Sequence, residues 1–326
     1  MNAKQPLLSL CIPTYNRAKY LKQSLESLLL QYGDIVEGKL EIIVSENPSS
    51  ENAQGVVNEY IDKGLPLRYN RNKENVGAAR NFYKLITMAC GKYIFLLGDD
   101  DVLLPGSLKY LLDVMEQDDW GLIHTWCGKR INEDIEISDN SSKFLEKIGY
   151  WITYMSASIF RRDIVAKVEN PEQYFNTHFM QIPFYIYSSI EREKNVFINK
   201  QLIKGGLDAK SNGGYNLFEV FVKNYLTIWQ GFVDRGEISK SLYKSIKKNM
   251  LTKFLVGYIY RVLIRHKNTK KIIESEYTRG GWGIEGAWGI LFHYYGRCWY
   301  FYVVLLKMPY YAIKGCAKRI IKGIKK

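Results

Sequence analysis

The sequence predicts an α/β protein whose mostly parallel sheet is flanked by helices and followed by a helical C-terminal extension. Three observations predict this class. Over roughly the first 128 residues, short apolar runs alternate with segments of helical spacing, which is typical of parallel, doubly wound sheets. From residue 216 to 266 the apolar spacing is helical. The chain of 326 residues is 47% apolar, which is enough to bury the core that such a fold needs.

The first half of the chain supplies the alternation. Its strands are continuous apolar runs, and its helices carry apolar residues three and four positions apart. Asn16 is the predicted N-cap of the first helix, and Gly64 and Gly91 are predicted to end the second and third. The predicted strands are residues 7–15, 40–46, 67–72, 93–97 and 120–127, and the predicted helices are residues 17–32, 51–64, 75–90 and 107–118.

The second half is less regular. Residues 129–147 are polar and are predicted to form a loop. Short strands near 150–160 and 195–203 and a helix near 179–191 are predicted to follow. No internal repeat is visible in the chain.

The net charge of +13 is unevenly distributed. After Glu285 there is no further acidic residue, whereas eight lysines and arginines follow. Such a tail favours an anionic surface, either a membrane or a nucleic acid. Its longest apolar run, residues 298–306, is well short of the roughly 20 residues that span a bilayer. Aromatic residues followed by lysines predict an interfacial segment against anionic lipid; the alternative is a packed helix with a solvated basic face.

The cysteines and the N-terminal residues indicate the cellular compartment of the protein. The five cysteines are scattered, odd in number and form no C-x-x-C pair, which fits reduced thiols in a cytoplasmic protein. The first apolar run is interrupted by polar residues and lacks a small-residue cleavage site. We therefore expect a cytoplasmic protein, peripheral at the inner face of the cell membrane.

Three adjacent carboxylates, Asp99, Asp100 and Asp101, stand between two apolar runs in YIFLLGDDDVLLP. Their mutual repulsion and their desolvation both oppose this arrangement. The triplet follows the predicted fourth strand, and open α/β sheets bind ligands at the carboxyl ends of their strands. Mg²⁺ and Mn²⁺ take oxygen ligands and commonly bridge carboxylates to substrate phosphates. The triplet therefore predicts a divalent metal site, with a solvated acidic turn as the alternative.

Three stretches, in this order and spacing, resemble the GT-A nucleotide-sugar glycosyltransferases of the large inverting family two. They are LSLCIPTYNRAKYLKQSLESLL, IIVSENPSS and NVGAARNFYKLITMACGKYIFLLGDDDVLLPGSL. The resemblance covers residues 7 to about 128 and is nearest to the bacterial surface-polysaccharide branch, including abequosyltransferase-like enzymes. It implies a GT-A, Rossmann-like fold. It also implies transfer of a sugar from a nucleoside-diphosphate donor, a UDP-sugar first among the candidates, to a glycan or lipid-linked glycan acceptor of O-antigen or capsule synthesis.

The same resemblance implies roles for individual residues. In that family the turn after the first strand contacts the nucleotide, an acid after the second strand pairs with the base, and an arginine lies near the diphosphate. The matching residues here are Pro13, Thr14, Tyr15, Arg17, Glu46 and Arg80. Glu46 stands where aspartate is more common. The D-x-D metal motif falls on the acid triplet, with Gly98 in place of its usual first acid, so that Asp100 matches the Mn²⁺ or Mg²⁺ ligand, Asp99 lies near the ribose or metal, and Asp101 supports them.

The resemblance to the family does not by itself identify the catalytic base in this chain. Family members commonly place it in a Glu-Asp pair that opens a helix in the acceptor half, and no such pair stands there in this chain. His178, where the predicted helix begins, is the first candidate, because an imidazole pKa of about 6.5 suits neutral pH; a packing or capping role is the alternative. Asp208, within GGLDAKSNGG, is the second candidate, although an aspartate among glycines is usually a turn former.

These features divide the chain into three predicted regions: a nucleotide-sugar-binding half (1–128), an acceptor-binding part (129–215) and a helical, aromatic and basic region at the membrane (216–326). Two other functions fit the sequence less well. A sugar nucleotidyltransferase usually cradles phosphates in a glycine-rich first loop, and CIPTYNRAKY has no glycine. A nucleic-acid-binding protein would be repelled by the acidic rim, so we expect no nucleic acid as a partner.

Overall fold

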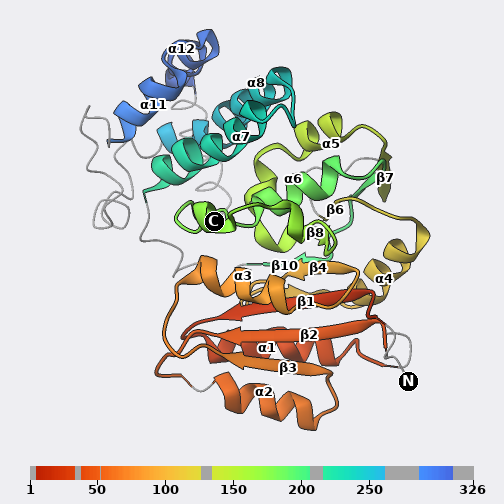
Figure 1. Ribbon diagram of the computed structural model, residues 1–326. Helices are drawn as coiled ribbons and strands as arrows, with labels where there is room; N and C mark the ends of the chain where they lie inside the picture. The colour runs from red at the N-terminus through yellow and green to blue at the C-terminus, as the bar shows by residue number, and fades with distance from the viewer. Residues whose placement is uncertain are drawn as a thin grey trace, which may run out of the picture. The chain divides into compact units, whose positions relative to one another are not determined.

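The structure is a computed structural model that describes residues 5–33, 38–51, 53–125, 134–205, 216–260 and 286–310. Its contacts divide the chain into two compact units, residues 1–211 and 212–326, each described by itself. The first unit contains the sheets, and the second is helical (Figure 1).

The centre of the first unit is an eight-stranded sheet in the order β3-β2-β1-β4-β8-β6-β9-β7. Its first four strands are all parallel, so their carboxyl ends meet at one edge; Thr14 pairs with Glu46, and Glu46 with Arg71. The bounds of these strands are Leu8–Thr14 for β1, Leu40–Glu46 for β2, Leu67–Arg71 for β3 and Tyr93–Leu96 for β4.

The other half of the sheet is mixed. Strand β8 runs antiparallel between β4 and β6, β9 pairs in parallel with β6, and β7 closes the edge antiparallel to β9. A separate two-stranded sheet joins β5 to β10. The bounds are Val102–Leu103 for β5, Ile123–Thr125 for β6, Ile135–Ser138 for β7, Ser158–Arg161 for β8, Asn195–Ile198 for β9 and Ile203–Lys204 for β10. The predicted α/β class with a mostly parallel sheet is confirmed.

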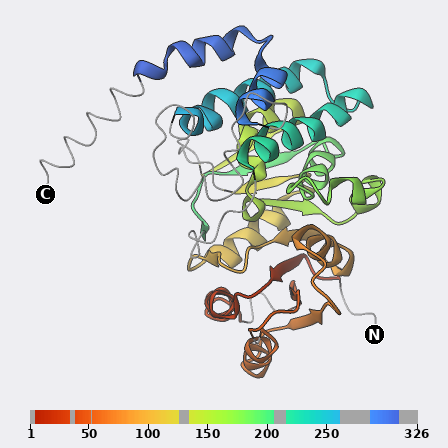
Figure 2. The same ribbon diagram turned by 90° about the vertical axis from the view of Figure 1, so that its left-hand side faces the viewer.

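Helices cover both faces of the parallel half (Figure 2). Helix α1 presents Leu21, Leu25 and Leu28 to the core at helical spacing, and each of the three side chains is fully buried. Burial of one leucine stabilises the fold by about 1.5–3 kcal/mol, so this stripe holds α1 against the sheet. The helices of this unit are α1 (Ala18–Leu29), α2 (Ala53–Asp62), α3 (Ala78–Met88), α4 (Ser107–Gln117), α5 (Ser141–Ile148) and α6 (Ile182–Ile190).

Two local predictions are wrong. Asn16 has a left-handed backbone with φ of 55° and does not cap α1; the carboxylate of Glu51 instead accepts a hydrogen bond from the Ala18 amide. The predicted loop over 129–147 contains β7 and α5 in its described part. The sequence pattern missed them because β7 is a four-residue edge strand stabilised by pairing with β9, which is distant in the chain.

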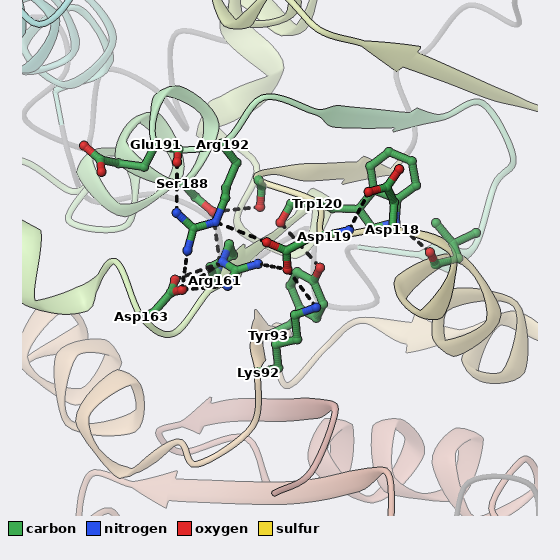
Figure 3. Close-up of polar contacts among 12 residues, drawn as sticks. Lys92, Tyr93, Asp118, Asp119, Trp120, Arg161, Asp163, Ser188, Glu191 and Arg192 are labelled. Carbon is green, nitrogen blue, oxygen red and sulfur yellow. Dashed lines mark hydrogen bonds and ion pairs between the residues drawn. The ribbon is translucent and has the colours of Figure 1, made fainter.

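A buried arginine ties β8 to its neighbours at the end of the sheet away from the carboxyl end of β4 (Figure 3). Arg161 donates hydrogen bonds to Asp163, at 2.9 Å through Nε and 2.6 Å through Nη2, and also to Asp119. Arg192 and Lys92 pair with the same two carboxylates. Burial by itself raises the pKa of Asp119, but the hydrogen bonds from Lys92 and Arg161 outweigh it and hold that pKa at about 2. This network fixes the register of β4, β8 and the chain entering β6.

The second unit is helical over its described residues, as predicted for the C-terminal extension. Two of its segments, η5 and η6, are π-helical. None of the helices in the described parts of the chain is long and apolar enough to cross a membrane. The predicted basic tail falls largely outside the described residues. The elements are η5 (Glu219–Asn224), α7 (Tyr225–Asp234), α8 (Lys240–Asn249), η6 (Met250–Leu255), α9 (Val256–Tyr258), α11 (Ala287–Tyr295) and α12 (Trp299–Leu306).

Candidate active site

A cavity of about 390 Å³ opens at the carboxyl ends of β1, β2 and β4, beside the first turn of α3. The end of β1, the residue after β2, the start of α3 and the turn after β4 all contribute to its wall. The residues predicted from the sequence that line it are Pro13, Thr14, Tyr15, Arg17, Asp99 and Asp100. Segments that are far apart in the chain therefore converge here, as the parallel pairing of β1 with β2 and β4 requires.

The three aspartates of the triplet are all buried and have different partners. Asp99 accepts a hydrogen bond of 2.8 Å from the Thr14 hydroxyl and one of 3.2 Å from Arg17 Nη1. The Asp100 carboxylate lies 3.7 Å from the same Arg17 nitrogen. Asp101 accepts a hydrogen bond of 3.1 Å from the Tyr154 hydroxyl and does not line the cavity. Two carboxylates thus border the cavity, and the third lies behind them.

Burial sets the electrostatics of this turn. It raises the pKa of Asp99 to about 6, although the hydrogen bond from Thr14 and the positive charge of Arg17 act in the opposite direction. Burial and the neighbouring Asp101 carboxylate raise the pKa of the Tyr154 hydroxyl, so Tyr154 stays a neutral donor. An additional cation at the turn would therefore relieve a real electrostatic cost at Asp99.

Two glycines allow the triplet its close packing. A Cβ on Gly98 would lie 3.0 Å from Asp101 Oδ2 and 3.2 Å from Asp100 Oδ1. A Cβ on Gly205 would lie 2.7 Å from Asp101 Oδ1 and would overlap the Tyr154 hydroxyl. The pairing of β10 with β5 brings Gly205 to this position. There is little room for a side chain beside the Asp100 and Asp101 carboxylates. This accounts for Gly98, which stands where the family motif usually has its first acid.

The carboxylates provide part of a metal site. Among the described residues, no three carboxylate, imidazole or thiol groups converge as a complete set of metal ligands. Asp99 and Asp100 lie side by side at the cavity wall, and Mg²⁺ is commonly held by one or two carboxylates while substrate phosphates and water fill its other positions. Two buried oxygen-donor side chains next to a cavity fit that kind of ion.

Glu46 lies below the cavity wall. It ends β2, is 1% exposed, and its Oε2 accepts a hydrogen bond from the Tyr69 hydroxyl and lies 3.8 Å from Arg71 Nε. Its other oxygen, Oε1, has no hydrogen-bond partner among the described residues. Glu46 does not line the cavity, whereas Asn47, which follows it, does.

A network of asparagine side chains at the cavity was not predicted from the sequence. Asn47 and Asn81 line the cavity, and Asn72 donates a hydrogen bond of 2.9 Å to the side-chain oxygen of each. Asn81 also accepts from the Ser45 hydroxyl at 2.6 Å and donates to the Ser45 carbonyl at 2.8 Å. The rule that found the acid triplet would have found two of these residues, because Asn47 and Asn72 directly follow β2 and β3.

The remaining candidates lie elsewhere. Arg80 is on an exposed position of α3, with its guanidinium 5.2 Å from the centre of the Phe175 ring, and does not line the cavity. His178 is exposed, has a left-handed backbone with φ of 64°, and precedes α6 without reaching the cavity wall. Asp208 falls outside the described residues.

The open sheet and the acidic turn beside a cavity at its carboxyl edge are the arrangement expected of a GT-A glycosyltransferase that uses a nucleotide-sugar donor. The chain belongs to the family described as Glycosyl transferase family 2, whose sequence model matches residues 9–182, more than half of the chain. It is an enzyme that transfers a sugar from a nucleotide-sugar donor, so the predicted family two and glycosyltransferase activity are confirmed, whereas the predicted branch, acceptor and metal dependence stay predictions.

Several known proteins are similar over most of the chain. The uncharacterized glycosyltransferase MJ1057 of Methanocaldococcus jannaschii is 25% identical over 83% of this chain and 97% of its own length. The GalNAc(5)-diNAcBac-PP-undecaprenol beta-1,3-glucosyltransferase of Campylobacter jejuni is 23% identical over 80% of this chain and 84% of its own. TarS residues 1–349 of S. aureus, solved in complex with UDP-GlcNAc, superimpose with a TM-score of 0.58 at 14% identity, covering 82% of this chain and 79% of that one. This last likeness shows the GT-A fold alone.

The abequosyltransferase branch has narrower support. Abequosyltransferase RfbV of Salmonella typhimurium is 36% identical, but over 32% of this chain and 31% of its own length. This match is too short to show the family, which the family model shows, and the branch, with the sugar it transfers, stays a proposal.

Proposed function

We propose that the chain is a metal-dependent, inverting glycosyltransferase that moves a sugar from a UDP-sugar to a lipid-linked glycan acceptor in surface-polysaccharide synthesis. The arrangement of Thr14, Arg17, Asp99 and Asp100 at the cavity carries this proposal. Two buried carboxylates that share the Arg17 guanidinium form a pair of adjacent oxygen donors at the cavity wall, and a diphosphate brings its own affinity for a divalent cation held there.

The donor occupies the cavity in this proposal. Its volume of about 390 Å³ is within the usual range for small-molecule sites. Pro13 and Tyr15 contact the nucleotide, and the amides of Asn47 and Asn81 border it. Glu46, whose oxygen Oε1 has no hydrogen-bond partner in the described parts of the chain, does not line the cavity and is proposed to reach the base edge once the donor is bound. Arg80 is proposed to turn toward the diphosphate. TarS, whose structures include complexes with UDP and UDP-GlcNAc, supports the choice of a UDP-sugar.

Asp99 and Asp100 would hold Mn²⁺ or Mg²⁺, with Asp101 keeping Asp100 in place through the packed turn. A divalent ion held there would stabilise the negative charge of the departing nucleoside diphosphate. Thr14 and Arg17 keep Asp99 oriented toward the cavity, and Asp99 must lose its proton to act as a ligand.

The acceptor is proposed from one relative and from the composition of the tail. The Campylobacter jejuni enzyme carries a PP-undecaprenol acceptor in its name. A lipid-linked acceptor would require this chain to work at a membrane, and its basic C-terminal residues favour the anionic inner face. His178 or Asp208 is proposed to take the proton from the acceptor hydroxyl, with residues 129–215 forming the acceptor-binding part.

A panel of nucleotide-sugars tests the proposal. The purified chain is incubated with each donor and Mn²⁺, and the free nucleoside diphosphate is measured. We expect one UDP-sugar to be hydrolysed slowly without acceptor and to be consumed faster with a lipid-linked glycan. Turnover that persists in excess chelator would refute the metal dependence, and turnover of a different nucleotide-sugar alone would refute the choice of UDP.

A further inference from the structure

The second unit contains a larger cavity, of about 860 Å³, that the donor chemistry does not use. Four lysines on a single face of α8 line it: Lys240, Lys244, Lys247 and Lys248. These positions are three and four residues apart, which places their side chains together on the helix surface. Arg297, between α11 and α12, adds a fifth positive charge from the opposite wall. Like charges at this spacing destabilise a helix, so the cluster has an energetic cost when nothing neutralises it.

The cavity has little negative charge of its own. Among the described residues that line it, none is acidic. In the described part of this unit, the ion pairs join Lys223 to Glu219 and Arg235 to Glu237, and neither involves a cavity cation. The carboxylate of Asp234 lies close enough to act on Tyr243, and it accepts a hydrogen bond from Gln230. Within the part of this unit that the structure describes, no ion pair neutralises the five cations, so they can bind an anion.

Aromatic rings contact two of the lysines that line the cavity. Lys247 lies 5.5 Å from the centre of the Tyr295 ring, and Lys248 lies 5.6 Å from that of Trp299. Trp299 is 70% exposed and begins an apolar face that continues along α12 through Tyr302 and Leu306, 47% and 80% exposed. Exposed aromatic and aliphatic side chains beside lysines are typical of segments that lie in a membrane interface.

We infer that this cavity binds the phosphate group of an anionic membrane lipid, while the exposed face of α12 lies against its acyl chains. A phosphate alone would satisfy the cations, but it would leave Trp299, Tyr302 and Leu306 in water. A lipid supplies the anion and the apolar surface together. The inference deepens the proposed membrane association by naming its site, and it rests on residues of the second unit alone.

Vesicle sedimentation of the full chain tests the site. The probes are phosphatidylcholine vesicles with and without phosphatidylglycerol. We expect strong binding only to the anionic vesicles. Because each lysine near an anionic surface contributes about 1 kcal/mol, the double variant Lys244→Gln/Lys248→Gln should bind about 30-fold more weakly. The control Lys223→Gln/Lys253→Gln removes the same charge from the same unit outside the cavity, and its binding should fall far less. Equal loss in both variants would mean diffuse attraction and would overturn the site.

Further measurements identify the ligand of this cavity and distinguish it from the donor site. Trp299→Ala should weaken anionic-vesicle binding while leaving the melting temperature within a few degrees. Complete displacement of the protein from vesicles by low inorganic pyrophosphate would assign the cavity to a soluble phosphate and overturn the lipid. Tighter binding to single-stranded RNA than to vesicles would also overturn it. Nucleoside-diphosphate release without lipid should be unchanged in the cavity variants, so failure of the proposed transferase chemistry is seen separately.

Discussion

The hydroxyl of Thr14 donates a 2.8 Å hydrogen bond to the carboxylate of Asp99, although the two residues are 85 positions apart in the chain. The contact exists because β1 pairs in parallel with β4, so the turns that follow both strands meet. Arg17 adds a second contact to Asp99 and approaches Asp100. The turn that follows β1 therefore orients the two carboxylates at the cavity wall.

Replacing Asp99 with asparagine should increase the stability of the fold at neutral pH. The pKa of Asp99 in the folded protein, about 6, lies above its ordinary value of 3.8, so ionisation destabilises the native state as the pH rises through 6. We expect Asp99→Asn to differ little from the parent at pH 4 and to be more stable by about 2–3 kcal/mol above pH 7. Urea unfolding at both pH values measures this. A stability difference independent of pH would contradict it.

Asp100 should be required for metal-dependent nucleotide binding. With UDP and Mn²⁺ at about 100 times the dissociation constant, the parent should gain about 2.7 kcal/mol of stability. Asp100→Ala should lose this gain, because it removes a carboxylate from the cavity wall. Asp113→Ala, at an exposed position of α4, is the matched control. If the Asp100 variant keeps its thermal shift with UDP and Mn²⁺, the proposed metal site is wrong.

His178 is tested by a substitution that respects its backbone. Asparagine tolerates the left-handed conformation found at φ of 64°, so His178→Asn avoids most of the strain that alanine would add. If His178 is the base, turnover should fall by about 10²–10⁴-fold while the affinity for the nucleotide is kept. Near-normal turnover would exclude His178, and Asp208→Asn would then be measured in the same way.

The Arg161 network should matter for stability and not for chemistry. The guanidinium is buried and bonded to Asp119 and Asp163, which are about half exposed. Removing it in Arg161→Met should destabilise the fold by about 1–3 kcal/mol. Lys194→Met, which breaks an exposed pair with Asp118, should cost less than about 1 kcal/mol. Denaturant midpoints compare the two, and equal values would argue against a structural role for the network.

Protonation of His124 should cause part of the loss of stability of the fold in acid. Its ring is fully buried on β6, and burial lowers its pKa to about 3. In the folded protein His124 resists protonation, whereas in the unfolded chain it is protonated below about pH 6.5. The free energy of unfolding is therefore unaffected by this histidine above about pH 6.5 and decreases as the pH falls toward 3. The stability of the parent should fall up to about 1.4 kcal/mol per pH unit more steeply than that of His124→Asn over this range. Identical slopes in urea titrations of the two proteins would refute this.

Much of the first unit could be predicted from the sequence because its signals are local. The apolar run of β4 is buried whatever it pairs with, and the stripe of Leu21, Leu25 and Leu28 defines α1 by its spacing alone. The acid triplet could be placed at a strand end for the same reason. The family motifs are likewise contiguous in the chain, and family membership could therefore be predicted before any contact was known.

The tertiary structure alone decided which of these residues meet. The insertion of β8 between β4 and β6, the edge strand β7, and the different partners of Asp99 and Asp101 all depend on pairings between distant segments. Asn81 illustrates the reason: it is an ordinary helix residue in the sequence, and it becomes part of the cavity wall because α3 packs beside the end of β2. Local patterns determine which segments are buried and regular, whereas the order of the strands determines which side chains share a site.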